Sequence, residues 1–224
     1  MIELDAVVYS GIFVGSALFL LWLISLRLHD VSIVDIWWAP GFAVIAWTAS
    51  DTPLEAGLRY GGILFLLTIW GLRLGIYLWI RNYGKPEDRR YQAFRAATPG
   101  FALKSLFTVF WLQGGLQLLI GLQIFAIARS TAPFNWVDLL GLMIGFAGVL
   151  VEAIADRQLT VFKRDPENSD KVMDRGLWAW TRHPNYFGNA VLWAGVAVVG
   201  LSAGAPIWTL LGPGLMWFLL LRVS

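Results

Sequence analysis

Residues 176–188 read GLWAWTRHPNYFG, and they join a polar stretch to a long apolar run. Tryptophan, arginine, histidine, asparagine and tyrosine side chains are therefore gathered at the mouth of an expected membrane segment. Holding such groups beside hydrocarbon costs free energy, so their density calls for a polar ligand or a structural role. The sequence favours a ligand site, and the alternative is a set of interfacial anchors with an aromatic belt.

A helix is expected to begin within this stretch. His183 precedes a proline, which biases its backbone toward an extended conformation and makes Pro184 a suitable first helical residue. Asn185 and Tyr186 then lie in the first turn, where free N–H groups and the positive end of the helix dipole favour an anion such as a phosphate.

The composition predicts a membrane protein, because 58% of the residues are hydrophobic and only 14% are charged. Segments with the length and apolarity of a membrane span lie at roughly 5–26, 33–50, 57–80, 103–128, 134–155, 185–202 and 206–222. We therefore predict an all-α fold, a polytopic bundle of about seven transmembrane helices. With no linker or composition break, residues 1–224 are expected to form a single integral membrane domain.

Several functional classes find no support in the sequence. The net charge is only +2 and no basic tract stands out, so nucleic acid is not an expected partner. The chain has no cysteine and two histidines, which argues against thiol chemistry and a protein-built metal centre. The first apolar run lacks the basic flank of a signal peptide and is expected to remain a membrane helix.

The distribution of basic residues predicts the topology. With the N-terminus outside, most of the 17 Lys and Arg residues lie on inner loops, chiefly over 81–104 and 157–182. The stretch 176–188 is then cytoplasmic, where nucleotide cofactors are found. We expect a multi-pass protein of a bacterial inner membrane in contact with membrane lipids.

Ionisable residues within the spans are candidates for function, since they usually face a cavity or pair with each other. Asp35 lies near the start of the second span and Arg73 lies in the third. Asp35 could be protonated and polarise a substrate carbonyl, or pair with Arg73 as an anion, or simply mark a helix end. Gln113 in the fourth span could contact a ligand or join two helices.

A second polar stretch, ADRQLTVFKRDPENSDKV at 155–172, is expected to be an inner loop that leads into residues 176–188. In this stretch Lys163 and Arg164 could bind phosphate, and Asp156 could accept a hydrogen bond from a ribose or an amide. Two polar clusters on one membrane face favour a ligand site over a solvated run of charges.

Taken together, several motifs resemble the membrane steroid 5-alpha-reductase family, in particular its bacterial branch of poorly characterised relatives. The matching residues are Arg81 with Gly84 and Lys85, EDRRYQ at 87–92, SLFTVFWLQG at 105–114, ADRQ at 155–158, GLWAWTRHPNYFG at 176–188 and LLLR ending at Arg222. They extend from the end of the third span onward.

This resemblance implies a seven-helix enzyme that binds NADPH from the cytoplasmic side and reduces a carbon–carbon double bond conjugated to a carbonyl in a lipophilic substrate. The hydride goes to the β-carbon, and an acid near the carbonyl stabilises the developing enolate. The candidate cofactor-binding residues are Asp156, Lys163, Arg164, Trp180, Arg182, His183, Asn185, Tyr186, Arg222, Gln113 and Lys85.

The chain departs from the family at the expected acid. The steroid enzymes carry a Glu and Tyr pair on the second and third helices, and the matching positions here are Trp38 and Trp70. Asp35, with Tyr77 or Arg73, is the candidate replacement in the catalytic site, and the substrate need not be a steroid. Family members are also expected to continue past the position of Ser224 into a basic tail.

Two other functions stay open. Isoprenylcysteine and phospholipid methyltransferase-like enzymes, which use S-adenosylmethionine, have a similar RHPxYxG, although ADRQ and LQG favour the reductase. A lipid-binding or transport protein would explain the helices but not the polar cluster.

Overall fold

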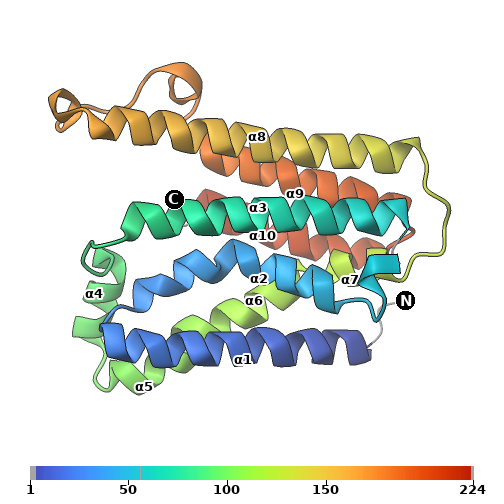
Figure 1. The fold of residues 1–224 in the computed structure, drawn as a ribbon, viewed down its shortest axis with the longest axis horizontal. Helices are drawn as coiled ribbons and strands as arrows, with labels where there is room; N and C mark the ends of the chain where they lie inside the picture. The colour runs from blue at the N-terminus through green and yellow to red at the C-terminus, as the bar shows by residue number, and fades with distance from the viewer. Residues whose placement is uncertain (1–3, 56, 223–224) are drawn as a thin grey trace. The chain divides into compact units, whose positions relative to one another are not determined.

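A computed structural model describes residues 4–55 and 57–222 of the chain. This part of the chain is almost entirely helical and contains no β-strand (Figure 1). The longer helices are α1 (Leu4–Leu28), α2 (Val34–Thr48), α3 (Leu58–Asn82), α8 (Trp136–Arg164), α9 (Pro184–Ser202) and α10 (Leu211–Arg222). Shorter elements are α4 (Arg89–Ala97), α5 (Phe101–Ser105), a π-helical turn (Leu106–Trp111), α6 (Leu112–Ile120) and α7 (Leu122–Ala128). The predicted all-α fold is confirmed.

Within the described ranges, 5 helical segments are long and apolar enough to cross a membrane. They are α1, residues 31–48, α3, residues 101–120 and α8. A chain with several such segments is a multi-pass integral membrane protein. Helix α9 and the helical stretch 207–222 occupy the expected sixth and seventh positions but are not among these segments, so their crossing stays a prediction.

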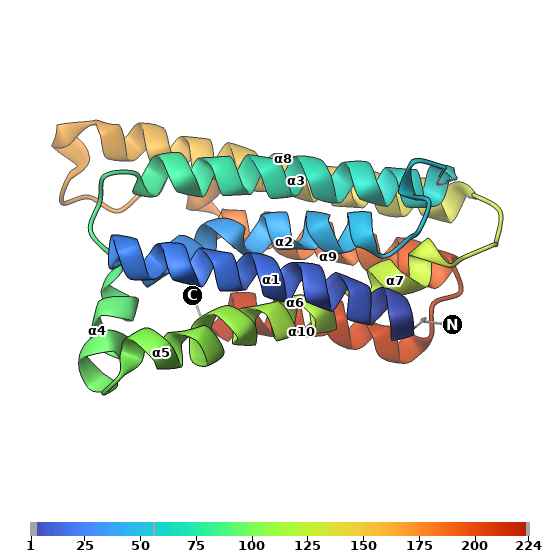
Figure 2. The same ribbon diagram turned by 60° about the horizontal axis from the view of Figure 1, so that its bottom comes forward.

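The chain forms two compact units, one ending at Ser130 and the other beginning at Thr131. In the first unit, α2 packs closely along α3 because glycine faces it. A Cβ atom on Gly71 would lie only 2.9 Å from the carbonyl oxygen of Ala39. The buried rings of Phe42 and Trp70 meet nearby with centroids 5.8 Å apart. Helix α1 runs beside α2 and α6 (Figure 2).

In the second unit, glycines let the backbones of α8 and α9 touch. A Cβ on Gly188 would lie 2.5 Å from the backbone nitrogen of Glu152 and 2.7 Å from the carbonyl oxygen of Gly148. The same close approach recurs two turns further along, where a Cβ on Gly141 would lie 2.9 Å from the carbonyl oxygen of Gly195. Small residues at this spacing are the usual means of close helix packing in a membrane.

Two expectations about element boundaries are wrong. Residues 155–164 are not a loop, because α8 continues through them to Arg164 and ends before Asp165 and Pro166. Proline disfavours helical backbone in the residue before it, which explains the stop at that point. The expected span 103–128 is likewise not one helix, because the helical segment 101–120 ends at Gly121, before α7.

Candidate functional site

Asp35 lies in the first turn of α2, where the chain has just left a short turn over Val31–Ile33. Its two carboxylate oxygens have different partners. Oδ1 accepts a hydrogen bond of 2.8 Å from the Tyr91 hydroxyl, and Oδ2 accepts one of 3.2 Å from the Arg90 guanidinium. The cation beside Asp35 is therefore Arg90, and its hydrogen-bonding phenol is Tyr91.

Both partners come from α4, which begins with a side-chain cap. The carboxylate of Asp88 accepts hydrogen bonds from the backbone N–H of Arg90 at 2.9 Å and from its guanidinium at 3.1 Å. The bond from the Arg90 side chain holds the pKa of Asp88 below its usual value and raises the pKa of Arg90. Arg90 is thus kept charged and directed between two carboxylates.

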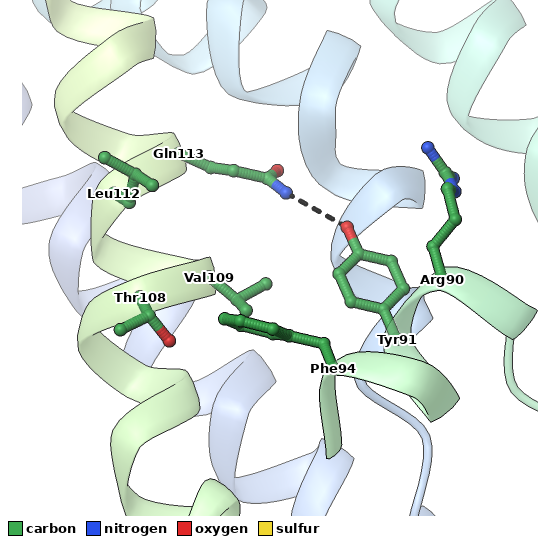
Figure 3. Close-up of a pocket in the computed structure, with 7 residues that line it drawn as sticks. All are labelled: Arg90, Tyr91, Phe94, Thr108, Val109, Leu112 and Gln113. Atoms are coloured by element: carbon green, nitrogen blue, oxygen red, sulfur yellow. Dashed lines mark hydrogen bonds between the residues drawn. The ribbon is translucent and has the colours of Figure 1, made fainter. Parts of the chain in front are cut away.

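The Tyr91 hydroxyl also links Asp35 to Gln113 at the start of α6. The amide nitrogen of Gln113 donates a hydrogen bond of 3.4 Å to the Tyr91 oxygen (Figure 3). Burial, and next the negative charge of Asp35, raises the pKa of Tyr91 above its usual value. The phenol is therefore protonated at neutral pH and available as a hydrogen-bond donor.

A pocket of about 330 Å³ adjoins this hydrogen-bonded chain (Figure 3). Its polar end contains Arg90, Tyr91 and Gln113. The rest of the lining comes from Phe94 on α4 and from Thr108, Val109 and Leu112 on the π-helical turn and α6. π-Helical turns are frequent at functional sites, and this one supplies part of the pocket wall. A lipophilic molecule with one polar group fits such a lining.

The positions matched to the Glu and Tyr pair of the steroid enzymes carry no polar acid. Trp38 packs edge to face on Phe42 at 5.5 Å, and Phe42 meets Trp70, which is fully buried. These three rings fill the contact between α2 and α3 with apolar surface. An acid for the expected chemistry would have to come from elsewhere, and the Asp35 and Tyr91 pair is a candidate.

The other candidates of the first unit lie on or after α3. Arg73 and Tyr77 are half-buried within the helix, and the Arg81 guanidinium lies 5.6 Å from the centroid of the Tyr77 ring. Lys85 is exposed in the loop that leads to α4. Of the candidates of this unit, the hydrogen bonds connect Asp35 with Gln113, through Tyr91.

In the second unit, the cluster expected around residues 155–188 forms between α8 and the start of α9. The amide nitrogen of Asn185 lies 3.4 Å from the carboxylate of buried Asp156. Gln158 accepts a hydrogen bond of 3.0 Å from the backbone N–H of Leu177, and the indole of Trp178 donates one of 3.1 Å to the carbonyl of Ala155. These bonds attach residues 176–178 to the last turns of α8.

The predicted start of α9 is confirmed, because the helix begins at Pro184 with His183 as its N-cap. His183 stacks on Tyr186 with ring centroids 5.1 Å apart. Trp180 is 90% exposed and Arg182 is exposed beside it. The side-chain oxygen of Asn185 is buried and has no hydrogen-bond partner within the described part of the chain.

Three remaining basic candidates are exposed at helix ends. Lys163 and Arg164 lie in the last turn of α8, and Arg222 is in the last turn of α10. Nothing in the structure tests their assignment to a cofactor, which stays a prediction.

Sequence reasoning assigned no role to Arg90, Tyr91 or Glu87. A signal was present, because all three belong to the polar hexapeptide EDRRYQ at 87–92. Its residues carry no apolar periodicity, and Val31 and Asp35, the partners that join them to the start of α2, lie more than 50 positions away in the chain. Only the fold brings them to Asp35.

These features define a multi-pass helical membrane protein with polar, hydrogen-bonded clusters at the ends of its helices. The model of one family, described as "Protein of unknown function (DUF1295)", matches residues 21–224, and the chain belongs to that family. Comparisons with curated proteins and with solved structures gave no match.

Proposed function

We propose that the protein is an NADPH-dependent membrane reductase that acts on a carbon–carbon double bond conjugated to a carbonyl in a lipophilic substrate. The observation that carries the proposal is the Tyr91 hydroxyl, held by Asp35 at 2.8 Å beside a largely apolar pocket. Reduction of an enone places negative charge on the carbonyl oxygen, and a fixed donor beside that oxygen lowers the barrier.

Tyr91 suits this role because it keeps its proton. When a substrate carbonyl enters the pocket, the phenolic hydrogen turns from Asp35 to the carbonyl oxygen and stabilises the enolate that hydride addition at the β-carbon would form. A proton from solvent would then complete the reduction at the α-carbon. Asp35 orients the phenol before the substrate binds, and Arg90 offsets the charge of Asp35. Phe94, Val109 and Leu112 exclude water around the apolar part of the substrate.

NADPH would supply the hydride, and the start of α9 has groups that suit it. Asn185 has a buried oxygen without a partner in the described part of the chain, which could accept a hydrogen bond from an amide or a ribose hydroxyl. Arg182, Lys163 and Arg164 are exposed cations that could bind phosphate. This donor and acceptor set also suits S-adenosylmethionine in part, so a methyltransferase-like enzyme is the second candidate.

Ligand-dependent stability tests the proposal first. A ligand that binds only the folded protein stabilises it by about 2.7 kcal/mol at a hundredfold excess over its Kd. We expect NADPH to raise the unfolding temperature of the detergent-solubilised protein and S-adenosylmethionine to leave it unchanged. The opposite pattern would favour the methyltransferase.

Turnover of conjugated enones, followed by NADPH consumption, is the second test. Asp35→Asn tests whether the carboxyl group of Asp35 is needed, because an amide can still hydrogen-bond but cannot transfer a proton or pair as an anion. Lost turnover with intact NADPH binding would make the carboxylate essential. Turnover at the wild-type rate in this variant would mean that Tyr91 can act as the acid without the Asp35 carboxylate.

A further inference from the structure

Glu87 lies in the loop between α3 and α4, and the mechanism proposed above does not use it. Its side chain is only 8% exposed. The carboxylate accepts hydrogen bonds from the Arg95 guanidinium at 2.7 and 3.1 Å and from the backbone N–H of Val31 at 2.8 Å. Burial opposes its ionisation, but the bonds from Arg95 and Val31 outweigh burial and hold the pKa of Glu87 below its usual value.

These bonds join segments that are distant in the chain. Val31 begins the short turn that precedes α2, and the hydroxyl of Ser32 in that turn accepts a 3.4 Å hydrogen bond from the backbone N–H of Asp88. Ser32 is fixed in turn by Asp30, whose carboxylate accepts from the hydroxyl at 2.5 Å and from the backbone N–H at 2.9 Å. The start of α4 is therefore tied to the start of α2, the helix that carries Asp35.

Tyr91 lies between the two ends of this ion pair. Glu87 comes four residues before Tyr91, and Arg95 comes four residues after it. Only Arg95 shares α4 with Tyr91, because Glu87 precedes the first residue of the helix. Residues four apart in a helix share one face, so Arg95 lies on the face from which Tyr91 projects, and its bonds to Glu87 join that face to the loop before the helix. The Arg95 guanidinium also lies 4.9 Å from the centroid of Phe101, and Phe94 packs edge to face on the same ring at 5.4 Å.

We propose that Glu87 and Arg95 are positioning residues that hold the Tyr91 hydroxyl against Asp35, an inference that rests on the function proposed above. We call Glu87, Arg95 and the Val31 N–H the α4 clip. A rotation of α4 about its axis would carry the hydroxyl away from Asp35, and the clip opposes it because Arg95 on α4 is bonded to Glu87, which the Val31 N–H holds in turn. A displacement of about 1 Å at a reacting group can cost a hundredfold in rate, so this restraint matters for catalysis.

The first experiment follows Tyr91 itself and does not require activity. Tyr91 is replaced by 3-fluorotyrosine, and its fluorine NMR signal is recorded in the otherwise unchanged protein and in the Glu87→Gln, Arg95→Gln and Glu167→Gln variants. Glu167 is an exposed glutamate in the turn after α8, so its variant is a control for the charge change. We expect Glu87→Gln and Arg95→Gln to move or broaden the signal and Glu167→Gln to leave it unchanged.

The second experiment is a double-mutant cycle on enone turnover. We expect Glu87→Gln to lower kcat by about tenfold with little change in KM or in NADPH affinity. In a Tyr91→Phe background the same change should cost nothing further, because a residue that acts through Tyr91 has no effect once the hydroxyl is gone. A purely structural role would lower kcat equally in both backgrounds.

The outcomes separate the two proposals. An unmoved fluorine signal in both clip variants overturns the clip, whatever the activity. An equal loss of kcat in both backgrounds overturns it as well. If the wild type reduces no enone but the signal moves, the clip stands and the proposed function fails. Arg95 is only half-buried, so its replacement should disturb the fold less than replacement of Glu87. Arg95→Gln therefore decides between the outcomes if Glu87→Gln does not fold.

Discussion

Asp35 and Tyr91 stabilise each other for different physical reasons. A carboxylate in the first turn of a membrane span is costly without partners, and here each oxygen has one, Tyr91 at 2.8 Å and Arg90 at 3.2 Å. The phenol gains an acceptor that fixes its rotation, and its burial and the nearby negative charge keep it protonated. The pair is thus held in one geometry, with the phenol directed at Asp35.

Replacing Tyr91 by Phe removes that donor while keeping the ring. We expect enone turnover to fall by about a hundredfold or more, the usual cost of losing one oxyanion donor. The wild-type pH profile gives a second check. The protonated phenol is the active form and its pKa lies above the usual value of 10.0, so Tyr91 should cause no loss of turnover up to that pH. A decline centred below pH 10.0 that Tyr91→Phe abolishes would contradict this assignment.

Replacing Asn185 or His183 tests whether the start of α9 binds the cofactor. Replacing Asn185 by Ala removes a buried acceptor at the start of α9, and we expect NADPH to bind about tenfold more weakly, as for one lost hydrogen bond. His183→Ala should also weaken NADPH binding, because it removes the ring that stacks on Tyr186 at the start of α9. Titration of each variant with NADPH measures both. Unchanged NADPH affinity in both variants would favour the alternative that residues 176–188 are interfacial anchors.

At the scale of single elements, α4 differs from the long helices because none of its residues is fully buried. A helix of 9 residues is marginal by its own propensity, so its order depends on Asp88, Glu87 and their partners. The long apolar helices could be predicted from the sequence because their hydrophobic length is a local property. Helix α4 could not, because it is short and polar and because Asp35, which bonds to it, and Val31, which bonds to the preceding Glu87, lie in a distant segment.

The close contact between α8 and α9 can be tested with a substitution at Gly188. A methyl group on Gly188 would meet the backbone of α8 at 2.5 Å, so Gly188→Ala should force the helices apart. We expect it to lower the free energy of unfolding by about 1–3 kcal/mol, the usual cost of overpacking.

Gly115→Ala is the matched control for Gly188→Ala. It is also a helical glycine, but a Cβ there would meet nothing within 4 Å. It should leave stability unchanged or raise it slightly, since alanine favours a helix. Equal unfolding midpoints for the two variants in detergent would contradict close packing at Gly188.

For the whole molecule, composition predicted the all-α membrane fold, because long apolar segments with few charges indicate that lipid surrounds the chain. The candidate site was predicted less completely. Asp35, Gln113, Asp156 and Asn185 could be selected as candidates because polar residues within apolar spans or at their ends are conspicuous. Their partnerships could not, since the hydrogen bonds from Tyr91 and Arg90 to Asp35 connect positions 56 and 55 residues apart.

The orientation of the whole chain in the membrane can be measured directly, because the protein has no cysteine and a single introduced thiol is labelled uniquely. Thr131 and Ser169 are exposed and lie on either side of α8. With the N-terminus outside, a membrane-impermeant maleimide should label Thr131→Cys in intact cells and Ser169→Cys only after permeabilisation. The reversed pattern would invert the predicted topology, and equal labelling of both in intact cells would mean that α8 does not cross the membrane.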